Sequence, residues 1–304
     1  MHGLPYWWVD VFATRAPISG NRLMVFVPAP QAMGDDDLCR RIAVEVGFSE
    51  VAFLVPDGGS ALPDDAGSYR ARIFTPGGEL GYAGHPTLGS AVVWALETAP
   101  MVDRLALTQR TSAATLRVQV ERRPGEIGHM AWVAVPEAAF SGALALAEVA
   151  LALGLRAGDL GSGGLPVCVA DGPTRQLLVP VVAAALRRLA PNHEAVAALC
   201  RSLGADLVYA FTPEAAEGRI RARGFGPALG VAEDPATGSA AGYLARYLVE
   251  HGALAAGGRV VVEQGEQVGR PSELLLHRRE DGELLLGGVV RAVSRGRLLP
   301  EFLA

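Results

Sequence analysis

Residues 83–96 read AGHPTLGSAVVWAL, and residues 237–250 read TGSAAGYLARYLVE. Each stretch has a glycine as its second residue and continues into a long, mostly apolar run. Apolar residues recur at i, i+3, i+4 and i+7 in both, which predicts helices. The two stripes are Leu88, Ala91, Val92 and Ala95, and Ala241, Leu244, Ala245 and Leu248. The first helix has almost no polar face, so we expect strands to enclose helices of this kind.

The two stretches form an internal repeat. When Glu79 is aligned with Glu233, an offset of 154 residues, residues 83–85 fall on residues 237–239. The tripeptides FTP and FGP lie upstream of the two copies, with a three-residue difference in length. One copy lies in each half of the chain, which predicts two similar lobes, each with strands around a central helix. Chance similarity is the alternative, and the shared register of glutamate, glycine and helix argues against it.

The two predicted helix starts suggest a binding site. Pro86 suits the first helical position, where a missing N–H is harmless, and His85 or Ser239 could cap a helix. Exposed N–H groups at a helix start attract anions. Two such starts facing one crevice between the lobes would hold a small carboxylate. Simple capping without a ligand is the alternative.

Composition limits the partners of the chain. Its 304 residues are half apolar and 19% charged, with a net charge of -5. The sequence has no block rich in Lys and Arg, so we expect neither nucleic acid nor an anionic membrane as a partner. It also shows no secretory signal pattern and no apolar run long enough to span a bilayer. The three cysteines show no pairing pattern. These features predict a protein of the reducing cytoplasm.

The pattern along the chain is of the α+β class. Residues 35–47 predict a helix, because three aspartates offer caps and Gly47 can end it. Further helices are expected at 144–154 and 193–204, with one strand at 166–170 between them. The other expected strands are 6–12, 23–29, 49–56, 69–76, 104–110, 115–122, 129–136, 207–211, 219–225, 259–265, 273–279 and 283–299.

Several segments resemble the signature segments of the PhzF-like phenazine-biosynthesis isomerase family. They are VDVFATRAPISGNRLMVF, FSEVAFLV, FTPGGELGYAGHPTLGSA, EDPATGSAAG and EQGEQVGRPS, and the resemblance runs from Val9 to about Arg297. It implies a diaminopimelate-epimerase-like fold, in which two pseudo-symmetric lobes each wrap a β-barrel around a central apolar helix. The active site would lie between the lobes. We place the N-terminal lobe at 1–125 plus about 286–304 and the C-terminal lobe at 126–285. The resemblance also implies a homodimer.

The resemblance assigns acid/base chemistry to Glu50, with His85 and Asp234 as the other active-site groups. It implies substrate-binding roles for Asn21, Gly84, Thr237, Gly238 and Ser239. From the residues alone, Glu50 enters an apolar strand, where partial burial would raise its pKa toward neutrality. The alternatives are an exposed strand-edge carboxylate for Glu50, a cap for His85 and turn residues for Asp234 and Asn21.

Some residues differ from those of related families, and these differences limit the reaction mechanisms that are possible. Related epimerases carry a cysteine before the glycine at each helix start, where this chain has Ala83 and Thr237. Neither residue can form a thiolate, which argues against racemisation by two thiols. Arg22 stands where the family usually has proline. Its positive charge could favour an acidic substrate; the alternative is an ordinary solvated side chain.

The sequence lacks a dinucleotide fingerprint and a histidine pair at metal-ligand spacing, so we expect no cofactor and no metal. It therefore predicts a cofactor-independent isomerase that moves a proton on a small cyclic or amino carboxylic acid. An amino-acid racemase or epimerase, and a non-catalytic binder on the same scaffold, are the alternatives.

Overall fold

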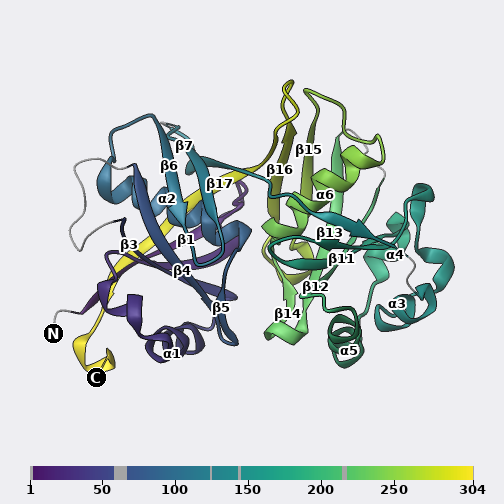
Figure 1. Cartoon of the computed structure of the whole chain (residues 1–304), viewed down its shortest axis with the longest axis horizontal. Helices are drawn as coiled ribbons and strands as arrows, with labels where there is room; N and C mark the ends of the chain where they lie inside the picture. The colour runs from purple at the N-terminus through teal and green to yellow at the C-terminus, as the bar shows by residue number, and fades with distance from the viewer. Residues whose placement is uncertain (1–2, 58–66, 124, 143–144, 214–217, 304) are drawn as a thin grey trace. The chain divides into compact units, whose positions relative to one another are not determined.

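The computed structural model describes residues 3–57, 67–123, 125–142, 145–213 and 218–303 (Figure 1). Within them the chain is a mixed α/β protein, and no helix there is long and apolar enough to cross a membrane. The helices are α1 (Asp36–Val46), α2 (Gly84–Thr98), α3 (Leu146–Ala152), α4 (Ala183–Arg188), α5 (His193–Leu203) and α6 (Gly238–Glu250). The strands of the first half are β1 (Leu4–Val11), β2 (Asn21–Phe26), β3 (Glu50–Pro56), β4 (Ser68–Thr75), β5 (Gly78–Leu80), β6 (Arg104–Arg110), β7 (Thr115–Glu121), β8 (His129–Ala134) and β9 (Ala139–Ser141). Those of the second half are β10 (Cys168–Asp171), β11 (Arg175–Pro180), β12 (Leu207–Phe211), β13 (Arg219–Gly226), β14 (Val231–Asp234), β15 (Arg259–Gln264), β16 (Ser272–Arg278) and β17 (Leu284–Leu298).

Most predicted elements are confirmed. β6 and β12 begin and end at the predicted residues. The ends of α1 follow the predicted chemistry, since Asp35 accepts a hydrogen bond from the Leu38 backbone N–H at 2.8 Å. Gly47 ends this helix with φ of 66°, a left-handed conformation that favours glycine.

The region between α3 and α5 was predicted incompletely. Only the strand near Cys168 was expected there, and the structure adds β11 and α4. Residues 177–186 form one continuous apolar run whose periodicity does not separate strand from helix. The short strands β5 and β14 were also missed, because three or four residues carry too little pattern.

The chain divides into two compact units, unit 1 with residues 1–134 and 287–304, and unit 2 with residues 135–286. The predicted boundary at 125 lies before β8, whereas this division places β8 in unit 1. Pairing explains the difference, because β8 pairs antiparallel with β7.

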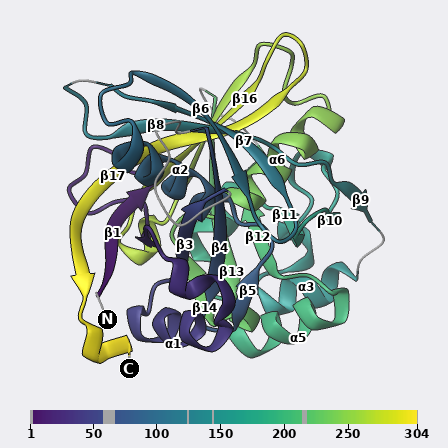
Figure 2. The ribbon, with the colours of Figure 1, turned by 60° about the vertical axis from the view of Figure 1, so that its left-hand side comes forward.

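Unit 1 surrounds α2 with strands. β1 pairs with β17 and β2, β2 with β3, β3 with β4, β4 with β6, β6 with β7, and β7 with β8. β8 pairs in turn with β17, so the series of pairings returns to its beginning. α2 packs against β1, β2, β3, β6, β7 and β8 (Figures 1 and 2). The predicted stripe of this helix is buried throughout.

Unit 2 repeats this strand order. β10 pairs antiparallel with β11, β11 parallel with β12, β12 antiparallel with β13, and β13 parallel with β15. α6 packs against β11 and β16, and its predicted stripe is also buried. A separate apolar core joins α3, α4 and α5 to strands β10–β13.

Matched ion pairs support the predicted repeat. Arg72 binds Glu79 in bidentate fashion at 3.0 and 2.6 Å, and Arg223 binds Glu233 at 2.9 and 2.8 Å. Each arginine also lies over a phenylalanine two residues later in its own strand. The repeat therefore matches residues with the same local geometry before α2 and before α6, with an offset of 154 for the glutamates and, because of the three-residue difference in length, an offset three residues smaller for the arginines and phenylalanines.

Candidate active site

Three predicted residues of unit 1 meet where two strands and a helix begin. Asn21 is the first residue of β2, Glu50 the first of β3, and His85 the second of α2. β2 and β3 are parallel, with Leu23 opposite Glu50, so both strands begin at the same edge. His85 Nε2 lies 3.5 Å from Glu50 Oε2, and His85 Nδ1 lies 3.4 Å from Asn21 Nδ2.

Hydrogen bonds set the proton position on His85. Ser49 Oγ donates to Asn21 Oδ1 at 3.4 Å, which turns the amide nitrogen of Asn21 toward His85. The amide can only donate there, so Nδ1 accepts and Nε2 of the neutral ring carries the proton. That N–H faces Glu50.

Glu50 is the acid/base candidate with the strongest electrostatic support. Its side chain is 16% exposed, and burial raises the pKa of its carboxyl group from 4.5 to about 7, although a hydrogen bond from Ser49 acts in the opposite direction. A group with such a pKa populates both protonation states at neutral pH and can accept and donate a proton. The predicted partial burial is confirmed.

The first residues of α2 do not occupy the helical positions that the sequence predicted. Ala83 is the N-cap and Gly84 the first helical residue, so Pro86 is third rather than first. His85 lies inside the helix and faces Glu50 rather than capping. Since the methyl side chain of Ala83 cannot accept a hydrogen bond, the first turn has no cap from its N-cap side chain.

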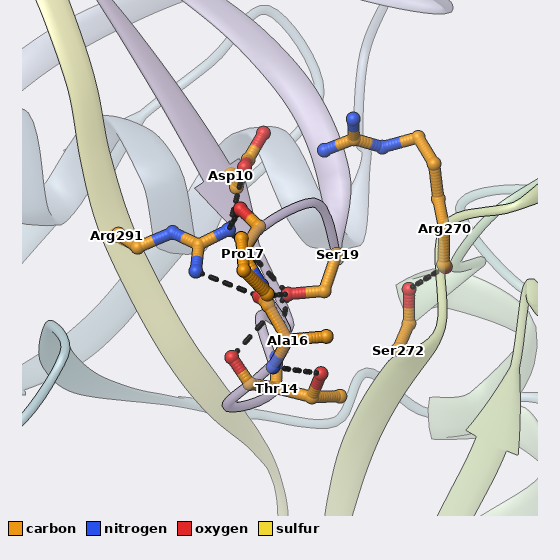
Figure 3. A network of polar contacts seen from close by, with 8 residues as sticks. All are labelled: Asp10, Thr14, Ala16, Pro17, Ser19, Arg270, Ser272 and Arg291. Atoms are coloured by element: carbon orange, nitrogen blue, oxygen red, sulfur yellow. Dashed lines mark hydrogen bonds and ion pairs between the residues drawn. The ribbon is translucent and has the colours of Figure 1, made fainter.

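A partly buried arginine holds the loop that leads into Asn21 (Figure 3). Arg291 of β17 binds Asp10 at 3.0 Å and donates to the carbonyls of Ala16 and Pro17 at 2.9 and 2.7 Å. Ser19 Oγ donates to the Ala16 carbonyl at 2.9 Å and accepts from a backbone N–H within the loop at 3.0 Å. These contacts fix the path of the chain directly before Asn21.

Arg22 packs against an aromatic ring, and its role toward a substrate stays a prediction. Its guanidinium lies 4.7 Å from the centroid of the Phe48 ring, and Phe48 packs against Trp8 at 5.3 Å. The cation–π contact thus joins the start of β2 to the segment that precedes Glu50.

Asp234 and Thr237 of unit 2 form a second polar group. Asp234 ends β14, and its Oδ2 accepts from Thr237 Oγ1 at 2.8 Å. Gln264 Nε2 donates to the Asp234 carbonyl at 2.8 Å, and its Oε1 accepts from the Thr237 N–H at 3.1 Å and from Tyr209 OH at 3.0 Å. Gly224 lies against them, where an added Cβ would be 2.5 Å from Thr237 Oγ1.

α6 begins beside this group. Thr237 is the N-cap without a capping bond, Gly238 is the first helical residue, and Ser239 the second. Ser239 does not cap, since its Oγ accepts from Gln176 Nε2 at 2.6 Å. Both helix starts thus lack a cap from their N-cap side chains. A shared carboxylate site stays a prediction.

Neither unit carries the groups of a two-base racemase. Val51 opposes Phe74 in unit 1 as Val208 opposes Phe225 in unit 2. The counterpart of Glu50 is therefore Leu207, which cannot transfer a proton. The three cysteines are buried, and burial raises the pKa of Cys39 and Cys168 to about 12 and that of Cys200 to about 11. They remain thiols at neutral pH.

Sequence reasoning missed four residues of these groups: Ser49, Gln176, Tyr209 and Gln264. Gln264 lies in EQGEQVGRPS, one of the quoted segments, which was the available signal. Ser49 likewise lies in the quoted segment FSEVAFLV, whereas Gln176 and Tyr209 lie in strands outside the quoted segments, where no local pattern singled them out. In the described ranges no three His, Cys, Asp or Glu side chains are grouped to hold a metal ion. The absence of a cofactor stays a prediction.

Comparison with known proteins places the chain in a family. The model of the PhzC–PhzF family, described as phenazine biosynthesis-like protein, matches residues 9–293. A trans-2,3-dihydro-3-hydroxyanthranilate isomerase of Pseudomonas aeruginosa is 35% identical over 277 residues, 90% of each chain. An uncharacterized isomerase of Deinococcus radiodurans is 32% identical and covers 86% of this chain and 82% of its own.

Several solved structures have a fold similar to that of this chain. A predicted epimerase from Pseudomonas aeruginosa is 34% identical, with a TM-score of 0.82 over 97% of this chain and 99% of its own. A hydroxyproline epimerase from Agrobacterium vitis shares the fold at 13% identity, with a TM-score of 0.64 over 98% of this chain and 91% of its own. The chain therefore belongs to the PhzC–PhzF family of phenazine biosynthesis-like proteins and is an isomerase.

Proposed function

We propose that the chain moves a proton between two carbons of trans-2,3-dihydro-3-hydroxyanthranilate or a closely related cyclic amino acid. Glu50 is the acid/base. The observation that carries the proposal is the partly buried Glu50 carboxyl group, with a pKa of about 7, beside His85. The substrate class comes from the name of the relatives that are about 35% identical to this chain.

One carboxyl group suffices for such a reaction. The Glu50 carboxylate takes a proton from one carbon of the substrate, and the electron pair is delocalised over the adjacent double bonds. The resulting carboxylic acid returns a proton to another carbon, so substrate and product are isomers and no electron acceptor is needed. His85 Nε2 lies 3.5 Å from Glu50 Oε2, and burial disfavours the charged form of the carboxyl group.

The first residues of α6 and of α2 are the carboxylate-binding groups in this proposal. Gly238 and Ser239 open α6, where backbone N–H groups and the helix dipole favour an anion. Gly84 plays the corresponding part in α2. Thr237 is held by Asp234 and Gln264 and sets the geometry of that turn.

The arrangement favours isomerisation over the two alternatives. A racemase needs a second acid/base, and the counterpart of Glu50 is Leu207. A simple binding protein has no use for a carboxyl group kept near neutral pKa by burial.

We also propose that each unit is a β-barrel around its central helix, that the two units are the predicted lobes, and that the protein is a cytoplasmic homodimer. The closed series of strand pairings around α2 and the matched strand order of unit 2 support the barrels. Sedimentation at micromolar concentration tests the dimer, and a species of 31.7 kDa would contradict it.

Turnover in deuterated water tests the chemistry. The wild-type protein should convert trans-2,3-dihydro-3-hydroxyanthranilate and incorporate deuterium at the carbon that receives the proton. Glu50→Gln should lose about a hundredfold to ten-thousandfold in rate, the usual contribution of a positioned acid/base. Glu45→Gln, an exposed carboxylate on α1, is the control. Full exchange by Glu50→Gln would refute the assignment.

A further inference from the structure

Gln176 lies in β11 with its amide buried against the start of α6. The residue is 1% exposed. Its Nε2 lies 2.6 Å from Ser239 Oγ and 3.3 Å from Thr174 Oγ1. Ser239 itself is half-buried, so its hydroxyl group lies between the buried amide and accessible surface.

The Gln176 amide nitrogen donates to two neighbouring hydroxyl groups. Thr174 Oγ1 donates to Tyr243 OH at 3.3 Å, so its lone pairs remain to accept from Gln176. One hydrogen of the Gln176 amide goes to Thr174 and the other to Ser239. Because Ser239 Oγ accepts this bond, its own hydrogen is not used by Gln176 and can be donated to another acceptor.

Unit 1 also has a carboxamide bonded to the second residue of its central helix, but at a different register, since Leu23 opposes Glu50 in unit 1 as Gln176 opposes Leu207 in unit 2. Asn21 at the beginning of β2 directs its amide to His85, the second residue of α2, as Gln176 of β11 does to Ser239 of α6. β2 and β11 occupy matching places, each parallel to the next strand along the chain. In both units a carboxamide fixes the hydrogen-bonding state of the second helical residue.

The other amide atom of Gln176 argues against a purely structural role. Its Oε1 is buried and has no hydrogen-bond partner in the part of the chain that the structure describes. Buried polar atoms in protein cores are nearly always paired, and exceptions concentrate where function requires them. An apolar residue would pack at this place without an unsatisfied oxygen.

We propose that Gln176 is a positioning residue that makes Ser239 a hydrogen-bond donor to the carboxylate of the substrate. The inference rests on the proposed function only in taking a carboxylate as the ligand of α6. Gln176 touches Ser239 and not the reacting atoms, so its removal should weaken binding more than it slows the proton transfer.

Calorimetric titration with 2-aminobenzoate, an aromatic amino carboxylate that cannot isomerise, tests the inference. Gln176→Glu keeps the shape, but its carboxylate accepts the Ser239 hydrogen and withdraws it from the ligand. Ser239→Ala and Gln176→Glu should each weaken binding by about tenfold or more, as expected for a lost hydrogen bond to a charged group. Their effects should not add in the double variant. In turnover, Gln176→Glu should raise KM with a smaller change in kcat.

Two further variants keep the test decisive. Gln176→Met fills the same volume without hydrogen bonds and replaces Gln176→Glu if that variant does not fold. Gln109→Met removes another fully buried amide, which is bonded to Thr87 and Tyr69, and should leave binding unchanged. Wild-type affinity in a folded Gln176 variant, additive effects with Ser239→Ala, or no binding by the wild-type protein would overturn the inference. Glu50→Gln should still bind the probe, so a failed acid/base assignment is distinguishable from a failed role for Gln176.

Discussion

Glu50→Gln should stabilise the folded protein at neutral pH while it removes activity. Burial raises the pKa of Glu50 from 4.5 to about 7, so the folded state binds this proton more tightly than the unfolded chain does. Each tenfold change in proton affinity corresponds to about 1.4 kcal/mol. The ionised carboxylate therefore lowers the free energy of unfolding by about 3 kcal/mol.

The sign of the pH dependence follows from the raised pKa. Below pH 4.5 the carboxyl group is protonated in both states and has no pH-dependent effect on stability. Between pH 4.5 and 7 the unfolded chain releases the proton first, so wild-type stability falls, and the full loss is reached above pH 7. Glutamine is neutral throughout and does not contribute this fall.

Urea unfolding between pH 4 and 8 measures the effect, with Glu45→Gln as the exposed control. The stability difference between Glu50→Gln and wild type should grow with pH by about 3 kcal/mol. A constant offset from altered hydrogen bonding does not affect this test. Parallel pH profiles for the two proteins would show that Glu50 titrates normally, and the acid/base argument would lose its electrostatic basis.

Three other perturbations test the remaining parts of the site. Alanine at any of the three cysteines should leave deuterium exchange unchanged in solvent assays, because burial keeps these thiols protonated; they are Cys39, Cys168 and Cys200. Arg291→Ala should destabilise unit 1 by about 3–5 kcal/mol in urea unfolding, because Asp10, 4% exposed, loses its buried partner; Arg291→Lys should recover part of this, and an unchanged stability would contradict the role of the pair. Gly224→Ala should reduce activity in steady-state assays, because the new Cβ would displace Thr237 from Asp234; full activity would show that this turn tolerates movement.

Several features of the fold were predictable because they depend on residues that are close together in the sequence. The ends of α1 follow from Asp35 and Gly47, which act within a single turn of helix. The stripes of α2 and α6 follow from helical periodicity, and their burial follows from the lack of polar residues along them. β11 and α4 could not be separated, because the apolar run from 177 to 186 is compatible with a buried strand and with a buried helix.

The internal repeat, the family resemblance and the candidates Glu50 and His85 were readable from residue types and their spacing along the chain. The contacts and burial of these candidates depend on the tertiary structure. Parallel pairing of β2 with β3 begins both strands at one edge and brings Asn21 toward His85. Burial, which depends on residues far along the chain, sets the pKa of Glu50. Gln176 acquires its partner only through the packing of β11 against α6, since Ser239 is 63 residues away along the chain and no local pattern links the two.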